Sequence, residues 1–394
     1  MLYTYGASWF LGLGIVIMYV YFAKKSKYLI TDISKSNKIT LSLILFFLLQ
    51  LLSTLIASTR TEIPTIRLIG ILHNYFVFLF FTLGFSLGSR EKQFNTIASQ
   101  AKKLLIIFAA ISVSASLYSN LISKSEISYN TPFGDVYLSF RAFISSGFFS
   151  RTSIFADYYN GSAILALALL FLHTSISIKS PEKQNQLTLE KLLPWAACLF
   201  VSITTGSRTV TVMLAVFAIF MLYPKAPKKA ALISLILGLS ASFIILPAVH
   251  ELINMRGDSN ETRFLIYSVS LQHMINDNPF FGIGYKPLTD DFKYPIGSHS
   301  TYIGYLVKNG IFIGLIPIML YLYIFLSTMN SALYSSKKNL QSGSFIKKLM
   351  LLIMLSILWL EDLDYIETNA LLIGMLFGQL YPEKEGAKNC ISTK

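Results

Sequence analysis

Charged residues are scarce in this sequence of 394 residues. Asp, Glu, Lys and Arg make up 13% of it and hydrophobic residues 54%, whereas a soluble globular domain carries about 25% charged residues. This composition excludes an ordinary soluble protein and predicts an integral membrane protein. The net charge of +13 does not indicate a nucleic-acid partner, because no basic run is interleaved with aromatic residues in a polar segment.

Cysteine and the common catalytic motifs are scarce as well. The two cysteines, Cys198 in an apolar run and Cys390 near the C-terminal end, give neither a disulfide framework nor metal-ligand spacing. The sequence also lacks a Gly-rich phosphate loop ending in Lys-Ser or Lys-Thr, a Gly-x-Ser-x-Gly elbow and a His-Glu-x-x-His pair. We therefore expect no metal, no cofactor and no direct use of ATP or a nucleotide-sugar. Transfer from a lipid-linked pyrophosphate donor fits these absences better.

Apolar runs, by contrast, fill most of the chain. A bilayer core about 30 Å thick is crossed by a helix of roughly 20 apolar residues. The eleven predicted spans lie at 6–23, 40–58, 65–88, 103–121, 156–174, 192–205, 208–223, 229–249, 300–327, 347–361 and 367–382. The first is interpreted as a span and not as a cleaved signal peptide, because lysines follow it and no basic stretch precedes it. The expected fold is all-α, a polytopic membrane helix bundle that forms one integral membrane domain over 1–394.

The distribution of lysine and arginine predicts the orientation of the chain. Of the 33 basic residues, 22 fall in alternate loops, beginning with Lys24 and ending with Lys394. The positive-inside rule places these loops in the cytoplasm, with the N-terminus outside and the C-terminus inside. The long polar segments, about 122–155 and 250–299, then lie outside together with the acidic turn at 361–367. We expect the chemistry on that outer face.

Five spans begin on the outer face, so their N-termini point there. A helix N-terminus offers free N–H groups and a partial positive charge, which together attract phosphate. The residues at these five ends include Arg67, Asn160, Arg208, His299 and Glu367. A site is expected among them.

Arg208 follows a tight turn in the sequence TTGSRTVT. Gly206 allows the turn between two spans, Ser207 can cap the next helix, and Arg208 lies in its first turn. One interpretation is an arginine that snorkels to the membrane interface. The other is a clamp whose planar guanidinium binds phosphate through two hydrogen bonds. We favour the clamp, because the helix N-terminus supports an anion at the same place.

Arg263 belongs to the large external loop. A predicted amphipathic helix at 261–276 carries Arg263 in its first turn and lies along the membrane face. Asn278 and the proline after it end this helix, and the sequence FGIGYKP forms a glycine turn. Arg263 either pairs with a nearby acid, Glu261 or Asp258, or acts as a second pyrophosphate ligand.

His299 lies where the external loop re-enters an apolar run, in the sequence GSHSTYIGYLVKNG. An imidazole has a pKa of about 6.5, which suits proton transfer near neutral pH. A lone histidine is more often structural, and the other histidines of the chain are interpreted in that way. No second His or Cys lies at ligand spacing, so a metal is not expected here. We predict that His299 is a general base.

Further residues of the outer face are candidate substrate contacts. They are Arg67, Arg151, Asn160, Tyr302, Asp362 and Asp364. Arg67 is a further anion contact, and Arg151 and Asn160 supply hydrogen bonds to a sugar. The acidic residues either orient His299, bind an acceptor sugar or keep that end of the bundle hydrated, and the sequence leaves these alternatives open.

The chain resembles the O-antigen ligase and polymerase superfamily of bacterial membrane glycosyltransferases. The resemblance rests on three motifs in order, TTGSRTVTVMLAVF, ETRFLIYSVSLQHMINDNPFFGIGY and SHSTYIGYLVKNGIFIGLIPI, and covers about 190–330. It implies a glycosyltransferase C-like bundle in the bacterial inner membrane, with a large external loop over 250–299 and the active face in the periplasm.

The resemblance also implies a reaction. Such enzymes move a glycan from undecaprenyl diphosphate to an acceptor sugar hydroxyl, without metal or nucleotide. Arg208 and Arg263 would hold the donor pyrophosphate, and His299 would activate the acceptor hydroxyl. Direct displacement implies inversion at the sugar carbon. The family often has Asn after this histidine, whereas this chain has Ser300, so no role is carried over to that neighbour.

Several functions stay open at this point. A polymerase joins lipid-linked repeat units into O-antigen, capsular polysaccharide or exopolysaccharide, and the form GSHSTY followed by KNG favours it. A ligase moves the finished polymer to lipid A-core. The expected partners are the lipid-linked donor, the glycan or lipid A-core acceptor, membrane lipid and a chain-length regulator. A polysaccharide or lipid transporter would carry charge at the mid-depth of its spans, where this chain has little, and a passive structural protein leaves Arg208, Arg263 and His299 unexplained.

Overall fold

The computed structural model describes most of the chain from residue 77 onward. The described residues are 45, 48, 49, 52, 77, 79–122, 126–131, 134–139, 141–142, 150–151, 159–177, 189–205, 207–223, 226–236, 258–286, 295–334, 343–361 and 367–381. Predicted spans 6–23, 40–58 and 65–88 therefore lie entirely or largely outside the described residues, and so does part of 229–249.

Helices dominate the described residues, and most begin and end near the predicted boundaries. They include Leu79–Ser89, α5 (Glu91–Ile122), α6 (Tyr159–Ser177), α7 (Leu189–Thr205), α8 (Arg208–Leu222), α10 (Asp258–Asp277), α11 (Thr301–Tyr334), α13 (Ser344–Leu360) and α14 (Glu367–Gly378). The helical prediction is confirmed for these segments. The largest difference is α5, which begins well before predicted span 103–121. Glu91 is favourable in a first helical turn, and no helix breaker separates it from the apolar run.

Two of the described helices are long and apolar enough to cross a membrane, Glu91–Ser114 and Thr301–Leu333. Shorter apolar helices of 10–17 residues accompany them. Large apolar side chains on these helices are exposed, among them Val212, Phe312 and Met319, and an extended exposed apolar surface is typical of lipid contact. The count of eleven spans stays a prediction.

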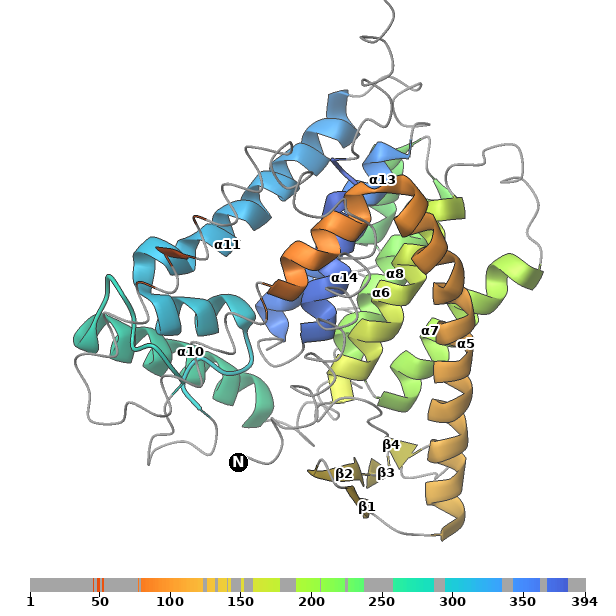
Figure 1. The fold of residues 1–394 in the computed structure, drawn as a ribbon, viewed down its shortest axis with the longest axis horizontal. Coiled ribbons are helices and arrows are strands. Elements are labelled where there is room, and N and C mark those ends of the chain that lie inside the picture. Colours follow the sequence, from red (N-terminus) through yellow and green to blue (C-terminus); the bar gives the residue numbers. More distant parts are fainter. Residues whose placement is uncertain are drawn as a thin grey trace, which may run out of the picture.

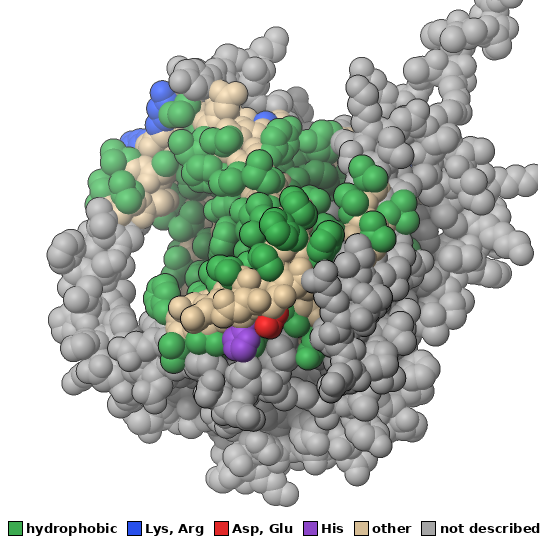
Figure 2. All heavy atoms as spheres, turned by 90° about the vertical axis from the view of Figure 1, so that its left-hand side faces the viewer, with side chains coloured by type: hydrophobic (Ala, Val, Ile, Leu, Met, Phe, Trp, Pro, Cys, Tyr) green, Lys and Arg blue, Asp and Glu red, His purple; other side chains and the backbone are tan. Residues whose placement is uncertain are grey.

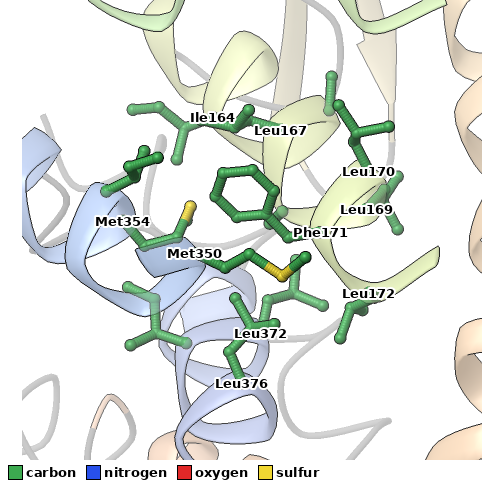
Figure 3. Close-up of a cluster of buried hydrophobic side chains, with 14 of the residues drawn as sticks. Ile164, Leu167, Leu169, Leu170, Phe171, Leu172, Met350, Met354, Leu372 and Leu376 are labelled. Atoms are coloured by element: carbon green, nitrogen blue, oxygen red, sulfur yellow. The ribbon is translucent and has the colours of Figure 1, made fainter. Parts of the chain in front are cut away.

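The centre of the bundle is formed by α6, α8, α13 and α14, with α5 and α7 along one side and α10 and α11 on the other (Figure 1). Figure 3 shows the core where α6, α13 and α14 meet. The side chains packed there include Ile164, Leu167, Phe171, Met350, Met354, Leu372 and Leu376. All of them are buried. Because lipid tails are as apolar as leucine, close van der Waals packing stabilises such a core inside a membrane.

Helix Leu79–Ser89 packs against α14 through small residues that we call the glycine seam. The glycine seam consists of Gly84, Gly88, Gly374 and Gly378. A Cβ atom on Gly84 would overlap the carbonyl oxygen of Leu371, and the other three glycines lie equally close to the opposite backbone. The two glycines of each helix are one turn apart, which lets the two backbones touch, as small residues do in membrane helix pairs.

The described parts of the segment 122–155, which was predicted to lie outside, contain strands, so the all-α prediction was incomplete. β1 (Glu126–Thr131) pairs antiparallel with β2 (Gly134–Ser139), and β3 (Arg141–Ala142) pairs antiparallel with β4 (Ser150–Arg151). Apolar and polar residues alternate along β1, which is the pattern of a strand with two unlike faces. A search for long apolar runs does not detect that pattern.

α11 is broken near its start. Gly310 has φ +66° and ψ −173°, a left-handed conformation that glycine adopts without steric cost, and it divides α11 into a short and a long segment. The loop after α10 fills the break. The N–H of Ile283 donates to the Val307 carbonyl at 2.8 Å, and the N–H of Gly284 donates to the Lys308 carbonyl at 2.9 Å. The predicted ninth span is therefore not one uninterrupted helix, and its first segment lies beside α10 (Figure 1).

Figure 2 shows the face of the molecule formed by α10 and α11. Its described surface is mainly hydrophobic, with Lys and Arg side chains at the upper end and acidic and His side chains near the lower end. The amphipathic helix predicted at 261–276 is present as α10. Met274 of α10 packs against α11, whereas Phe264, Leu265 and Ile275 are exposed, so the apolar residues of α10 occupy two faces.

Candidate functional site

Helix ends meet at the C-terminus of α13, in a group of contacts that we call the helix-end junction. The carbonyl oxygen of Glu361 accepts hydrogen bonds from the backbone N–H of Thr301 at 3.2 Å and from its hydroxyl at 2.9 Å. The hydroxyl of Thr209 in α8 donates to Oε1 of Glu361 at 3.4 Å. Arg263 of α10 donates to the Leu360 carbonyl at 3.4 Å. The ends of α8, α10, α11 and α13 are thereby linked.

The junction brings the three predicted catalytic residues onto neighbouring elements. Arg208 is the first residue of α8 and precedes Thr209. Arg263 lies early in α10 and bonds directly to the end of α13. His299 lies just before the first residue of α11, whose backbone is bonded to Glu361.

His299 has a left-handed backbone conformation, with φ +66°. It is the one non-glycine residue with positive φ among the residues that the structure describes. Such a conformation costs of order 1–3 kcal/mol and is found most often at functional sites. Two contacts with α10 hold the turn: the Tyr267 hydroxyl donates to the His299 carbonyl at 2.9 Å, and the Gly297 N–H donates to the Ser270 hydroxyl at 2.7 Å.

The His299 imidazole is partly buried, and its protonation follows from that. Burial, together with the positive charges of Arg263 and Lys286, lowers the pKa of His299 to about 4. The neutral form therefore predominates at pH 7, and one ring nitrogen can accept a proton. A depressed pKa also makes the imidazole a weaker base. An anion beside Arg263 and Lys286 would offset their charges and raise the pKa of His299.

The two arginines are accessible. Arg208 is exposed and Arg263 is partly exposed, so an anion can approach either guanidinium. Ser207 caps α8 by accepting a hydrogen bond from the Val210 N–H at 3.5 Å, which confirms the predicted cap. The side chains of Asp258 and Glu261, the acids considered as partners of Arg263, lie outside the described set.

Two charged residues of this region were not predicted as site residues. Glu361 is 2% exposed and joins three helices. The sequence places it in an acidic turn and leaves the role of that turn open. Lys286 acts electrostatically on His299, and its ammonium lies against Gly304 in the first turn of α11. The available signal for Lys286 was its position directly after the glycine turn FGIGY, on the face where cations are fewer.

Tyr302 was predicted to contact substrate, and the structure gives it another environment. Its side chain is 0% exposed. Its hydroxyl donates to the Leu355 carbonyl at 3.0 Å, and its ring centroid lies 4.5 Å from that of Trp359. Tyr302 therefore joins α11 to α13 and presents no surface to a substrate in this structure. The turn of the helix directs position 302 toward α13, whereas His299 precedes the helix.

The remaining predicted substrate contacts lie wholly or partly outside the described residues. Arg67, Asp362 and Asp364 are not described. Arg151 ends β4 and Asn160 lies in the first turn of α6, but only their backbones are described.

The described polar groups of the junction are of the kinds that bind an anion and accept a proton. Its polar groups are cations, hydroxyls, an imidazole and one buried carboxylate. Within the described ranges, no group of three His, Cys, Asp or Glu side chains is arranged to hold a metal ion. Cationic groups at helix N-termini bind phosphate, and a neutral imidazole accepts a proton.

Comparison with known proteins identifies the family of this segment. Residues 194–319 match the family described as O-antigen ligase. No curated protein and no solved structure matches the chain. The matched segment includes Arg208, Arg263 and His299. This match supports the resemblance of the segment to the O-antigen ligase/polymerase superfamily, whose members are integral membrane enzymes of the glycosyltransferase type that act on lipid-linked glycans.

Proposed function

We propose that this protein is a membrane glycosyltransferase that transfers glycan repeat units from undecaprenyl diphosphate to the hydroxyl of an acceptor sugar. In doing so it polymerises O-antigen, capsular polysaccharide or exopolysaccharide. One observation carries the proposal: Arg263 and Lys286 act on a partly buried, neutral His299, and all three belong to the matched segment. A diphosphate leaving group requires cations, and an attacking hydroxyl requires a base.

The donor diphosphate binds at the cationic groups. Arg208 at the N-terminus of α8 and Arg263 on α10 contact its phosphate oxygens, while the prenyl chain stays in the lipid. As the bond between sugar and diphosphate breaks, negative charge builds on the diphosphate. Guanidinium groups and a helix N-terminus that are already in place stabilise this charge without reorganising.

His299 acts on the acceptor. The acceptor hydroxyl oxygen forms a bond to the anomeric carbon of the donor sugar, and the bond from that carbon to the diphosphate oxygen breaks. The electron pair of the broken bond leaves with the diphosphate, and the unprotonated ring nitrogen of His299 takes the hydroxyl proton. Direct displacement inverts the configuration at the anomeric carbon. We expect the reaction to need no metal and no cofactor.

The donor also prepares the base. A bound diphosphate offsets the charges of Arg263 and Lys286, so the pKa of His299 rises when the donor is present. His299 therefore becomes a competent base in the donor complex and stays a weak one in the free enzyme.

The proposed setting is the bacterial inner membrane. The helix-end junction faces the periplasm, the N-terminus lies outside and the C-terminus lies in the cytoplasm. Beside donor, acceptor and membrane lipid, a chain-length regulator is the expected protein partner, and no nucleic acid is involved.

An O-antigen ligase is the alternative function. It would move the finished polymer to lipid A-core, and the same residues would serve, because both reactions use a donor diphosphate and an acceptor hydroxyl. A polysaccharide or lipid transporter has weaker support, since the charged residues described above gather at helix ends and not at the mid-depth of the spans.

A strain that lacks the protein distinguishes these functions when its surface glycans are separated by size. Loss of long chains, with a single repeat unit still attached to the surface lipid, identifies a polymerase. Long polymer that accumulates on undecaprenyl diphosphate, together with bare lipid A-core, identifies a ligase. Unchanged glycans contradict both functions and favour transport.

Two substitutions test the assigned residues in that strain. Arg208→Ala is expected to abolish product while the protein stays inserted and folded. His299→Gly removes the imidazole and tolerates φ +66°, so it should fold at least as well as the natural chain while turnover falls about 10²–10⁴-fold. Near-normal polymer with Arg208→Ala, or unchanged turnover with His299→Gly, would remove that residue from the mechanism.

A further inference from the structure

We propose that Lys286 is a third cation of the donor site and contacts the diphosphate of a prenyl-linked donor, next to Arg263 and against the first turn of α11. The inference rests on the function proposed above and adds a side chain that sequence motifs do not identify.

The backbone that leads to Lys286 is fixed to α11 by the break at Gly310. In an uninterrupted helix the Val307 carbonyl would accept from the N–H of Ile311. Here Ile311 donates to the Pro279 carbonyl at 2.9 Å, and the Val307 carbonyl accepts from Ile283 at 2.8 Å. Each of the two segments, helix and loop, donates a backbone hydrogen bond to the other. The loop that carries Lys286 therefore has a defined position.

The side chain of Lys286 crosses the first turn of α11 at Gly304. A Cβ atom on Gly304 would lie 2.6 Å from both Cε and Nζ of Lys286, and 2.9 Å from the Gly297 carbonyl oxygen. Glycine at this position therefore leaves the space that the lysine side chain occupies. Lys286 is partly exposed.

Lys286 and Arg263 act on the same group from different elements. After burial, the charges that lower the pKa of His299 are those of Arg263 and Lys286. Both cations therefore lie close to the imidazole that is proposed to deprotonate the acceptor. Other described titratable groups of this region include Tyr267, bonded to the His299 carbonyl, and Glu361, whose carboxylate accepts from Thr209.

The number of cations at the site determines which phosphate group of a donor it prefers. Two guanidinium groups and an ammonium match an anion that carries more than one negative charge and several oxygens. A diphosphate supplies both, whereas a monophosphate has fewer oxygens and less charge to share among three cations. A lysine acts as a compact point charge, so it complements the bidentate arginines. We expect the site to prefer prenyl diphosphate to prenyl monophosphate.

Binding of undecaprenyl diphosphate and undecaprenyl phosphate to the purified full chain in lipid nanodiscs tests this inference. The natural protein should bind the diphosphate more tightly. Lys286→Gln should raise the Kd for the diphosphate about tenfold, because one charge-assisted contact is lost. It should also reduce the preference for the diphosphate over the monophosphate. Lys286→Arg should retain most of the affinity. Gly304→Ala keeps the lysine but fills its space, so it should also weaken binding.

A matched control and a second readout separate a ligand contact from a structural role. Lys229→Gln removes a charge beside the Tyr223 ring, at the opposite end of α8, and should leave donor binding unchanged. Removal of Lys286 also removes a charge that opposes protonation of His299, so the acid limb of kcat/KM should move to higher pH.

The outcomes distinguish this inference from the function on which it rests. If the natural protein binds the diphosphate, and Lys286→Gln binds it equally well with an unmoved acid limb, the inference is overturned while the proposed function stands. If the natural protein neither binds undecaprenyl diphosphate nor transfers glycan, the proposed function is overturned and the role of Lys286 with it. Weaker binding by Lys286→Gln at an unchanged melting temperature supports the inference.

Discussion

The bundle core and the helix-end junction are held together in different ways. In the core, apolar side chains such as Phe171 and Met350 pack together (Figure 3), and the glycine seam brings two helix backbones into contact. At the junction, hydrogen bonds end on the main-chain carbonyls of His299, Leu360 and Glu361. The junction is therefore held by hydrogen bonds, most of them accepted by main-chain carbonyls, and not by apolar packing.

This difference predicts how each region tolerates substitution. A change at the glycine seam alters the distance between two helices and therefore affects the whole bundle. A change of one junction side chain, such as that of Glu361, removes single hydrogen bonds and leaves the Glu361 carbonyl bonded to Thr301. Three experiments test this contrast, and their expected effects decrease in order.

The largest effect is expected when the glycine seam is filled. Gly84→Leu places a side chain where the Leu371 carbonyl lies, and overpacking of this kind costs about 1–3 kcal/mol or more. We expect the solubilised protein to lose its monodisperse peak in size-exclusion chromatography, with Gly84→Ala less severe. Val212→Leu, at a position of α8 that is 59% exposed, is the control and should elute normally. A normal peak for Gly84→Leu would contradict contact between the backbones.

An intermediate effect is expected at Glu361. Glu361→Ala removes the carboxylate that accepts from Thr209 but keeps the carbonyl that accepts from Thr301. Leaving the Thr209 hydroxyl without this acceptor should cost about 1–3 kcal/mol, measured as a lower melting temperature. Adding Thr209→Val should recover part of the loss, because the hydroxyl that has lost this acceptor is then absent. Strict additivity of the two losses would show that the pair does not interact.

The smallest effect is one of pH. Because the pKa of His299 is lowered to about 4, kcat/KM should stay level through pH 6.5 and fall only as the pH approaches 4. The unfolded chain binds this proton more readily than the folded one. The stability that His299 contributes is therefore fully present above pH 6.5 and is lost as the pH falls toward 4.

A pH–rate profile and a series of melting temperatures measure both effects of His299. His299→Gly provides the baseline for stability, since its melting temperature should depend less on pH between 4 and 6.5. An inflection of kcat/KM near pH 6.5 in the natural protein would mean that burial and the charges of Arg263 and Lys286 do not lower the pKa of the imidazole.

Local signals in the sequence predicted much of the fold. Ser207 caps α8, and α10 ends at Asp277, directly before Asn278. The limits of α7, α8, α13 and α14 fall close to the predicted spans. These features depend on neighbouring residues, and hydropathy or capping preference is sufficient to predict them.

Contacts between segments that are distant in the sequence could not be predicted from these local signals. Thr209 and Glu361 are 152 residues apart in the sequence, and no local pattern pairs them. Hydropathy did not predict the break at Gly310, because the residues around it are apolar. The break depends on hydrogen bonds from a loop that is distant in the sequence. Tyr302 looked accessible because it follows the loop, although packing against Trp359 buries it. The candidate residues were predictable by chemical type, and the hydrogen bonds that join their helices were not.

The glycine seam has a consequence for how the protein is made. It joins Leu79–Ser89 to α14, which begins at Glu367, so most of the chain is synthesised between the two partners. Synthesis runs from the N-terminus, and the earlier helix therefore enters the membrane with its glycine-lined groove unfilled. Contact between these two helices therefore forms only after most of the helices between them have been synthesised.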